Sequence, residues 1–217
     1  MIDHLANLLA LRALATSLSV ATTGVTTLAA TATGYTRAAG SFTADGFAVG
    51  MEVVPSGFAA NTPGVVTEVT ALSLAVDGGR SAEAAAPGRM LVVGLPALRA
   101  WENIDFEPEL ERWYVEEDYV PGPVRTMTVG ERGVIEGDPQ YVLKLYAPQG
   151  RGVTALYGLA DGLLRVFAPH TALPLPSGDE LRVRGNPAPY RGQLVAREGR
   201  ALVVVTVPLR VRTLNVI

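Results

Sequence analysis

The chain has 217 residues, of which 48% are hydrophobic and 18% are charged, so it can bury a proper core and is not a disordered tail. It contains no cysteine, which excludes disulfides and cysteine-based zinc sites and favours folding in the cytoplasm. The net charge of −3 indicates no particular class of partner. No apolar run approaches the roughly 18 residues that span a bilayer, so we expect no membrane partner.

Residues 1–16 predict an amphipathic helix, with Asp3 as its cap and Arg12 on its wet side. Its apolar positions follow helical spacing: Ile2, Leu5, Leu8, Leu9 and Leu14. The stretch resembles the core of a signal peptide. However, it begins with an acid and has Arg12 inside its apolar part, so we interpret it as a helix of the fold.

Residues 17–95 are rich in Thr, Gly, Val and Ala, and short apolar runs alternate there with turn residues. About five strands are predicted, at 25–33, 50–54, 64–69, 72–76 and 90–95. We expect a small all-β insertion of the size of an SH3-like barrel, with Phe47 and Phe58 in its core. Because only its ends need to be close, the rest of the chain is expected to fold without it.

Residues 96–217, together with 1–16, predict an α+β domain in which two helices pack on a mixed or antiparallel sheet. Strands are expected at 113–120, 127–135 (with a turn at Gly130), 141–146, 181–184 and 193–197, and a long final strand follows a hairpin at Glu198-Gly199. Pro208 within that last strand indicates an edge position or a bulge. The second helix, 153–167, has one apolar face: Leu156, Leu159, Ala160, Leu163, Leu164 and Phe167.

Charge is segregated along this domain. One stretch is acidic and has Arg112 as its counter-charge: Glu102, Asp105, Glu107, Glu109, Glu111, Glu116, Glu117 and Asp118. The last third is basic: Arg182, Arg184, Arg191, Arg197, Arg200, Arg210 and Arg212. Both stretches suit the wet faces of strands. We hypothesise that the acids of one subunit, within 107–118, lie near the arginines of its neighbour. Direct binding of nucleic acid by the arginines is the weaker alternative.

No residue pattern indicates a catalytic, cofactor-binding or metal site. The two histidines, His4 and His170, lack further imidazole or thiol partners, and no nucleophile elbow, phosphate loop or dinucleotide fingerprint is present. We therefore expect no enzyme and no cofactor. Two alternatives stay open: a carbohydrate- or cell-surface-binding module, with Tyr35, Phe47 and Phe58 along a sugar groove, and a hydrolase that uses the acidic cluster.

Several short motifs follow one another along the chain: Trp101-Glu102-Asn103, Phe106-Glu107-Pro108, Tyr146-Ala147-Pro148, Gly150, Gly152 and Ala160-Asp161. Their order resembles that of the tail terminator (tail completion) proteins of long-tailed bacteriophages. The resemblance covers residues 1–16 and 96–217, and the closing run 200–213 is similar to the family's last strand. Residues 17–95 depart from compact members, so the family says little about the insertion.

This resemblance implies a structural virion protein at the neck of the tail. Such proteins form a homo-oligomeric ring, usually a hexamer, that caps the tail tube protein and ends its polymerisation. The ring then meets the head–tail connector or stopper protein, and viral DNA passes through its lumen without sequence recognition. Assembly in the cytoplasm of the bacterial host is expected.

Overall fold

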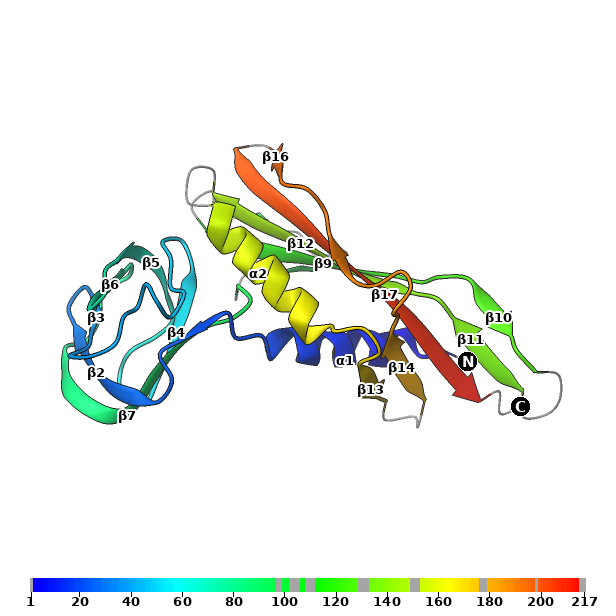
Figure 1. The fold of residues 1–217 in the computed structure, drawn as a ribbon, viewed down its shortest axis with the longest axis horizontal. Helices are drawn as coiled ribbons and strands as arrows, with labels where there is room; N and C mark the ends of the chain where they lie inside the picture. The colour runs from blue at the N-terminus through cyan, green and yellow to red at the C-terminus, as the bar shows by residue number, and fades with distance from the viewer. Residues whose placement is uncertain are drawn as a thin grey trace.

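A computed structural model describes residues 2–96, 99–101, 106–107, 112–128, 133–148, 153–175, 179–197 and 199–214. The chain is mixed helix and strand but predominantly β, with a small barrel beside a larger, elongated sheet (Figure 1). Two helices lie beside the larger sheet. None of the described helices is long and apolar enough to cross a membrane.

The first helix, α1 (His4–Thr16), begins where predicted. Asp3 is its N-cap, and the Asp3 carboxylate accepts a hydrogen bond from the Ala6 N–H at 3.0 Å. Its buried positions are Asn7, Leu11 and Ala15. Leu5 and Leu9, which the periodicity placed on the buried face, are 65% and 54% exposed. The helix is therefore rotated relative to the prediction, because polar residues of α1 also face the sheet.

The barrel is built from seven strands whose residues are mostly small or β-branched. They are β1 (Ala21–Thr22), β2 (Thr26–Thr31), β3 (Gly34–Thr36), β4 (Glu52–Ser56), β5 (Gly64–Val69), β6 (Ser73–Val76) and β7 (Glu83–Val93). The strand order is β1-β7-β2-β3-β6-β5-β4, and an additional pairing of β7 with β4 closes the ring of strands. Closure removes the open edges that a sheet of this size would otherwise expose.

The long strand β7 makes closure possible by pairing with different neighbours along its length. Its first part pairs with β2, with register shifts, and its last residues pair with β1 and β4. Gly88 lies at the register shift between the Leu28–Ala86 and Thr26–Arg89 pairs and has a φ of +80°. A side chain would be strained in this conformation, so glycine permits the strand to bend at the barrel corner.

The larger sheet has ten strands. They are β8 (Arg99–Trp101), β9 (Tyr114–Val120), β10 (Val124–Thr126), β11 (Val134–Gly137), β12 (Gln140–Pro148), β13 (Ala172–Pro174), β14 (Glu180–Val183), β15 (Tyr190–Arg191), β16 (Val195–Arg197) and β17 (Arg200–Leu214). The main path runs β10-β11-β17-β12-β9-β8, and β14, β15 and β16 pair with the other side of β17. Pairings are antiparallel except for β8 with β9.

Strand β17 is the spine of this sheet, so the prediction that Pro208 marks an edge strand or a bulge was wrong. On the β12 side Pro208 lies opposite Gln140, and the next residue, Leu209, donates its N–H to the Pro139 carbonyl at 2.9 Å. Along its other side, β15 pairs with residues 205–206 and β14 with 209–212. Pro208 therefore lies in a gap between two partner strands, where a missing N–H breaks no ladder hydrogen bond.

The second helix, α2 (Val153–Val166), contacts β12, β15 and β17. Leu156, Leu159 and Leu163 of its predicted apolar face are at most 2% exposed. Phe167, just after the helix, is fully buried and lies edge-on to the ring of Tyr141. Burial of each such side chain is worth about 1.5–3 kcal/mol, so this seam contributes a large share of the domain's stability.

The barrel and the larger sheet share one hydrophobic core cluster. At Gly50, whose φ is +89°, an added Cβ would lie 2.5 Å from the indole Nε1 of Trp113, just before β9. At Gly162 on α2, an added Cβ would lie 2.8 Å from a methyl carbon of Leu18. Both glycines allow close approach between the two parts, so the insertion is packed against the domain.

Candidate interaction surface

The acidic stretch does not form one solvated face. Glu116 and Asp118 point away from the helices, and both accept from the Lys144 ammonium at 2.7 Å. Burial alone would lower the pKa of Lys144, but the hydrogen bonds to Asp118 and Glu116 raise it overall. Tyr146 donates to the other Glu116 oxygen at 3.0 Å. These two acids therefore share one cation within the chain.

Glu117 points to the helix side and is only 2% exposed, which corrects the expectation of a wet strand face. Its carboxylate meets the Arg99 guanidinium at 3.2 Å and the Arg12 Nε at 3.4 Å, and it accepts a hydrogen bond from the Tyr141 hydroxyl. Burial first, and then the Glu117 charge, raises the pKa of Tyr141. A buried carboxylate with two arginines is compensated, so the cluster ties α1, β8, β9 and β12 together.

The basic stretch is also partly paired within the chain. Glu136 on β11 meets the Nε of Arg212 at 2.8 Å and the Nε of Arg210 at 3.6 Å. Asp138 meets Arg125 at 2.6 Å and Arg184 at 3.1 Å. Two acids therefore serve four arginines. The hypothesis placed the acids of 107–118 near the arginines of a neighbouring subunit. Internal pairs occupy some members of both sets, the acids through Lys144, Arg12 and Arg99 and the arginines through Glu136 and Asp138.

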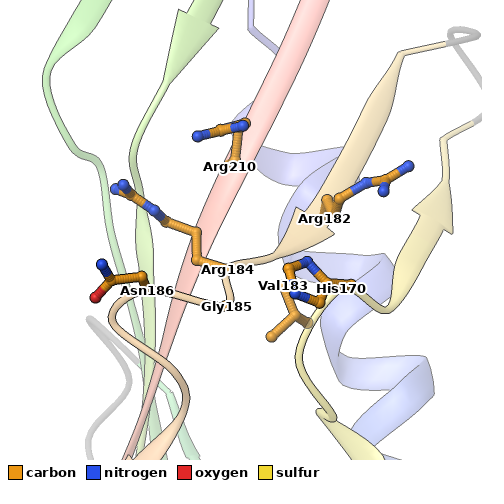
Figure 2. A pocket seen from close by; sticks show the side chains of 7 residues that line it. All are labelled: His170, Arg182, Val183, Arg184, Gly185, Asn186 and Arg210. Carbon is orange, nitrogen blue, oxygen red and sulfur yellow. The ribbon is translucent and has the colours of Figure 1, made fainter.

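A pocket of about 390 Å³ remains between β14 and the end of β17 (Figure 2). Among the residues that the structure describes, no carboxylate lines it. The described lining residues are His170, Arg182, Val183, Arg184, Gly185, Asn186 and Arg210. Arg182 and Arg210 are direct cross-strand partners, an arrangement of like charges that costs stability. In Figure 2 Arg184 and Arg210 extend to the same side, whereas Arg182 points the other way. The pocket is therefore a basic site on an otherwise balanced surface.

One end of the pocket is shaped by His170 and Gly185. His170 has a φ of +70°, which is uncommon for a residue with a side chain, and its N–H donates to the Val183 carbonyl at 3.0 Å. A Cβ on Gly185 would lie 2.5 Å from the His170 ring. The ring can pack there only because residue 185 is glycine. Sequence analysis treated His170 as a loop residue without a role, and nothing in its local pattern indicated this contact.

The aromatic residues proposed for a sugar groove belong to the barrel, and its packing accounts for their positions. Tyr35 and Phe47 are 1% and 3% exposed, so they lie in the barrel core, as predicted for Phe47, and offer no sugar-stacking face. Phe58 is partly buried and lies beneath the Arg89 guanidinium, 4.4 Å from the ring centroid. Within the described ranges, no group of three or more His, Asp or Glu residues could hold a metal ion.

Some predicted features lie outside the described residues. They are the acids Glu102, Asp105, Glu109 and Glu111, the motif residues Asn103, Pro108, Gly150 and Gly152, the turn at Gly130, and Glu198 of the final hairpin. In place of one strand at 127–135, the structure has β10 and β11 on either side of the segment that contains Gly130.

A large sheet whose charged face is organised in ion pairs, with a basic pocket near one end, is suited to a protein that acts by association. The chain belongs to the phage tail terminator protein family. The family model matches residues 83–209, more than half of the chain, from the barrel strand β7 to β17. No curated protein matches the chain. One solved structure has 21% identity and a TM-score of 0.43, over 54% of this chain and 79% of that chain.

Membership of this family makes the protein a structural component of a phage tail that assembles with other virion proteins. The resemblance seen in the sequence is thereby confirmed. The matched region includes β7, which the sequence analysis had assigned to the insertion, and does not include residues 1–16.

Proposed function

We propose that the protein forms a ring, of six subunits as the resemblance implies, that caps the phage tail tube, ends its polymerisation and joins the tail to the head connector. The single observation that carries this proposal is the family match across β7–β17, which contains the whole of α2 and most of the larger sheet. The role involves no chemical step, so the protein acts as a structural element and not as an enzyme.

The form of the sheet supports a ring. One edge of the sheet is formed by β8 and β10 and the other by β13, β15 and β16, so the two edges differ in sequence and pairing. Different complementary surfaces on one subunit give head-to-tail contacts, and these close into a ring when the rotation per subunit fits. A strand edge is also a ready template for pairing with another chain.

The proposed partners are the tail tube protein below the ring and the connector or stopper protein above it. Viral DNA would pass through the lumen, held by no sequence-specific contact. The site of action is the neck of the virion, after assembly in the host cytoplasm. We propose no partner for the barrel, because its aromatic side chains lie in its core.

Tube growth in the presence of the protein tests this function. Purified tail tube protein from the same phage is polymerised with and without the terminator, and negative-stain microscopy records ring formation and tube length. We expect rings with a central hole and shorter, capped tubes as the protein concentration rises. Tubes of unchanged length, without rings at their ends, would contradict the proposal.

A further inference from the structure

The pocket end of the sheet has more arginines than acids, and its acids are shared unequally. The Asp138 carboxylate lies 2.6 Å from the Arg125 guanidinium and 3.1 Å from that of Arg184. Glu136 lies 3.6 Å from Arg210, beyond hydrogen-bond distance, and 2.8 Å from a second arginine of β17. Four guanidiniums against two carboxylates leave a surplus of two positive charges in this described cluster. Arg184 and Arg210 are the more distant partners of the two acids.

These two arginines also converge. Arg184 and Arg210 extend to the same side of the pocket (Figure 2). The acids that they contact, Glu136 and Asp138, are not among the described lining residues. A guanidinium has five N–H donors. Arg184 turns one terminal nitrogen to Asp138, and the buried Nε of Arg210 makes no hydrogen bond, so the pair offers several donors to a ligand.

Two features of the pocket cost stability in the chain alone. Arg182 lies directly opposite Arg210 in the pairing of β14 with β17, and like charges in this arrangement repel. His170 has a φ of +70°, which is strained for a residue with a side chain, and its ring packs against Gly185 at the pocket wall. Strain and unfavourable charge pairs persist at functional sites. The surplus of positive charge then makes the ligand an anion.

The donor set favours a phosphate group over a carboxylate. A carboxylate has two oxygens, which one guanidinium satisfies in a two-bonded geometry. A phosphate group on an ester has three strong acceptor oxygens and a charge of about −1.5 to −2 near neutral pH. Two guanidiniums, from Arg184 and Arg210, match this charge. Asn186 also lines the pocket and adds a neutral amide donor for the third oxygen.

The size of the pocket indicates that the phosphate group is attached to a larger ligand. The pocket has a volume of about 390 Å³. A bare phosphate ion would fill only a part of this volume, because it has four oxygens and a water molecule takes about 30 Å³ in the liquid. The rest of the described wall includes Val183, Gly185 and the His170 ring, which would lie against the group that carries the phosphate.

We propose that this pocket binds the phosphate group of an organic phosphate, with Arg184 and Arg210 on its oxygens and Asn186 as a further donor. The site lies within one chain, so the inference goes beyond the proposed ring and does not depend on it. Two sources carry the same chemistry: a small phosphate ester of nucleotide size and the backbone of a nucleic acid. The experiment separates them.

Isothermal titration calorimetry on the full chain at low salt tests the site. The probes are inorganic phosphate, deoxyadenosine monophosphate, a short single-stranded DNA without terminal phosphates, and acetate as the carboxylate. The pocket variant is R184Q/R210Q. The matched control is R165Q/R191Q, which removes the same charge at an exposed position of α2 and at the ion-pair partner of Asp161, neither of which lines the pocket. Circular dichroism checks that each variant is folded.

The parent should bind deoxyadenosine monophosphate more tightly than acetate, and the affinity should fall as salt is added. The pocket variant should bind the phosphate probe at least about tenfold more weakly, because two charge-assisted contacts are lost, and the control should bind like the parent. If the pocket variant is unfolded, Asn186→Asp tests the same site at an exposed position. Its added carboxylate should repel the phosphate and weaken binding by about tenfold as well.

The source of the phosphate follows from the order of affinities. Tighter binding of the monophosphate than of the DNA supports a small ester, and the reverse order supports a nucleic acid. A parent that binds none of the phosphate probes overturns the inference. Equal losses in the pocket variant and the control, or acetate bound as tightly as the monophosphate, would overturn it too. A parent that forms no ring contradicts the proposed function and leaves this site untouched.

Discussion

The barrel and the larger sheet are stabilised over different sequence distances. In the barrel, ion pairs join close neighbours in the chain, such as Arg37 with Asp45 and Arg89 with Glu83. In the larger sheet, Arg12 reaches Glu117 and Glu136 reaches Arg212. Of the nine described glycines with positive φ, eight lie within 17–95. The ion pairs and positive-φ turns of the barrel are therefore mostly local in sequence, although β7 closes it by pairing with the distant β1 and β2, whereas these ion pairs of the sheet join distant segments.

This difference bears on how far the two regions depend on each other. A region held by local turns can be gained as an insertion without changing the register of its host. The sheet, by contrast, brings together charged residues from distant segments, so a change in its register would break ion pairs such as Arg12 with Glu117 and Arg212 with Glu136. Substitutions in each region measure how far the two are independent.

The largest effect is expected from Leu163→Asp, in the seam between α2 and the sheet. Leu163 is fully buried, so the variant loses packed apolar surface and places an unpaired carboxylate there. We expect the free energy of unfolding in urea to fall by about 3 kcal/mol or more. Arg165→Asp, at an exposed position of the same helix, is the control and should cost well under half as much. Equal losses would mean that the seam does not dominate stability.

A smaller effect is expected when the barrel is removed. Ala21 and Thr22 are Cα partners of Val93 and Val92, so the chain enters and leaves the barrel side by side. Replacing residues 23–91 by a two-residue Asn-Gly turn would join Thr22 to Val92 as a hairpin. The contacts of Leu18 and Val20 with α2 would be kept. The remaining domain should stay folded and soluble.

The cost of this excision should be about 2 kcal/mol, because Trp113 loses the cover of Gly50 and its surroundings. Urea unfolding followed by circular dichroism measures it, and a red shift of the tryptophan emission reports the exposed indole. An insoluble product would show that the barrel completes the core of the sheet, contrary to the sequence-based expectation that the domain folds without it.

Local patterns predicted most elements, and long-range contacts explain the failures. The α2 face and the Asp3 cap are confirmed, since both depend on spacing within one turn or a few turns. Arg12 was expected on the wet side, yet it faces Glu117, more than a hundred residues later. An acid in an acidic run gives no sign that it will be buried. The pocket was not predicted either, because its arginines converge only when β14 pairs with β17.

The contact between the two regions can be tested with two glycines. Gly50 and Gly78 both have positive φ, but an added Cβ at Gly78 meets nothing within 4 Å, whereas at Gly50 it meets Trp113. Each Gly→Ala change has a backbone cost of about 1–2 kcal/mol. We expect Gly50→Ala to cost about 1 kcal/mol more, from displacement of the indole. Equal unfolding free energies for the two variants would mean that the barrel does not press on Trp113.

The smallest effect concerns pH, on the open face of the sheet. Burial, and then the Glu116 carboxylate, raises the pKa of Tyr146 to about 12, from an ordinary value of 10.0. A raised pKa means that the folded state holds the proton more firmly than the unfolded state. The resulting stability is fully present below about pH 10 and is lost as the pH rises toward 12. Unfolding by urea should therefore become easier over this interval.

Tyr146→Phe isolates this contribution, because the barrel residue Tyr35, whose pKa is also raised by burial, is unchanged in the variant. At neutral pH the variant should be less stable by about 1 kcal/mol, the worth of the hydrogen bond to Glu116. Between pH 10 and 12 the parent should lose more stability than the variant, so the difference between them shrinks. Glu116→Gln, which keeps the burial of Tyr146 but removes the charge, should fall between the two. If the parent and Tyr146→Phe lose stability in parallel over this interval, the Tyr146 hydroxyl is not held as the structure places it. The loss of stability at alkaline pH would then come from tyrosines that both proteins contain.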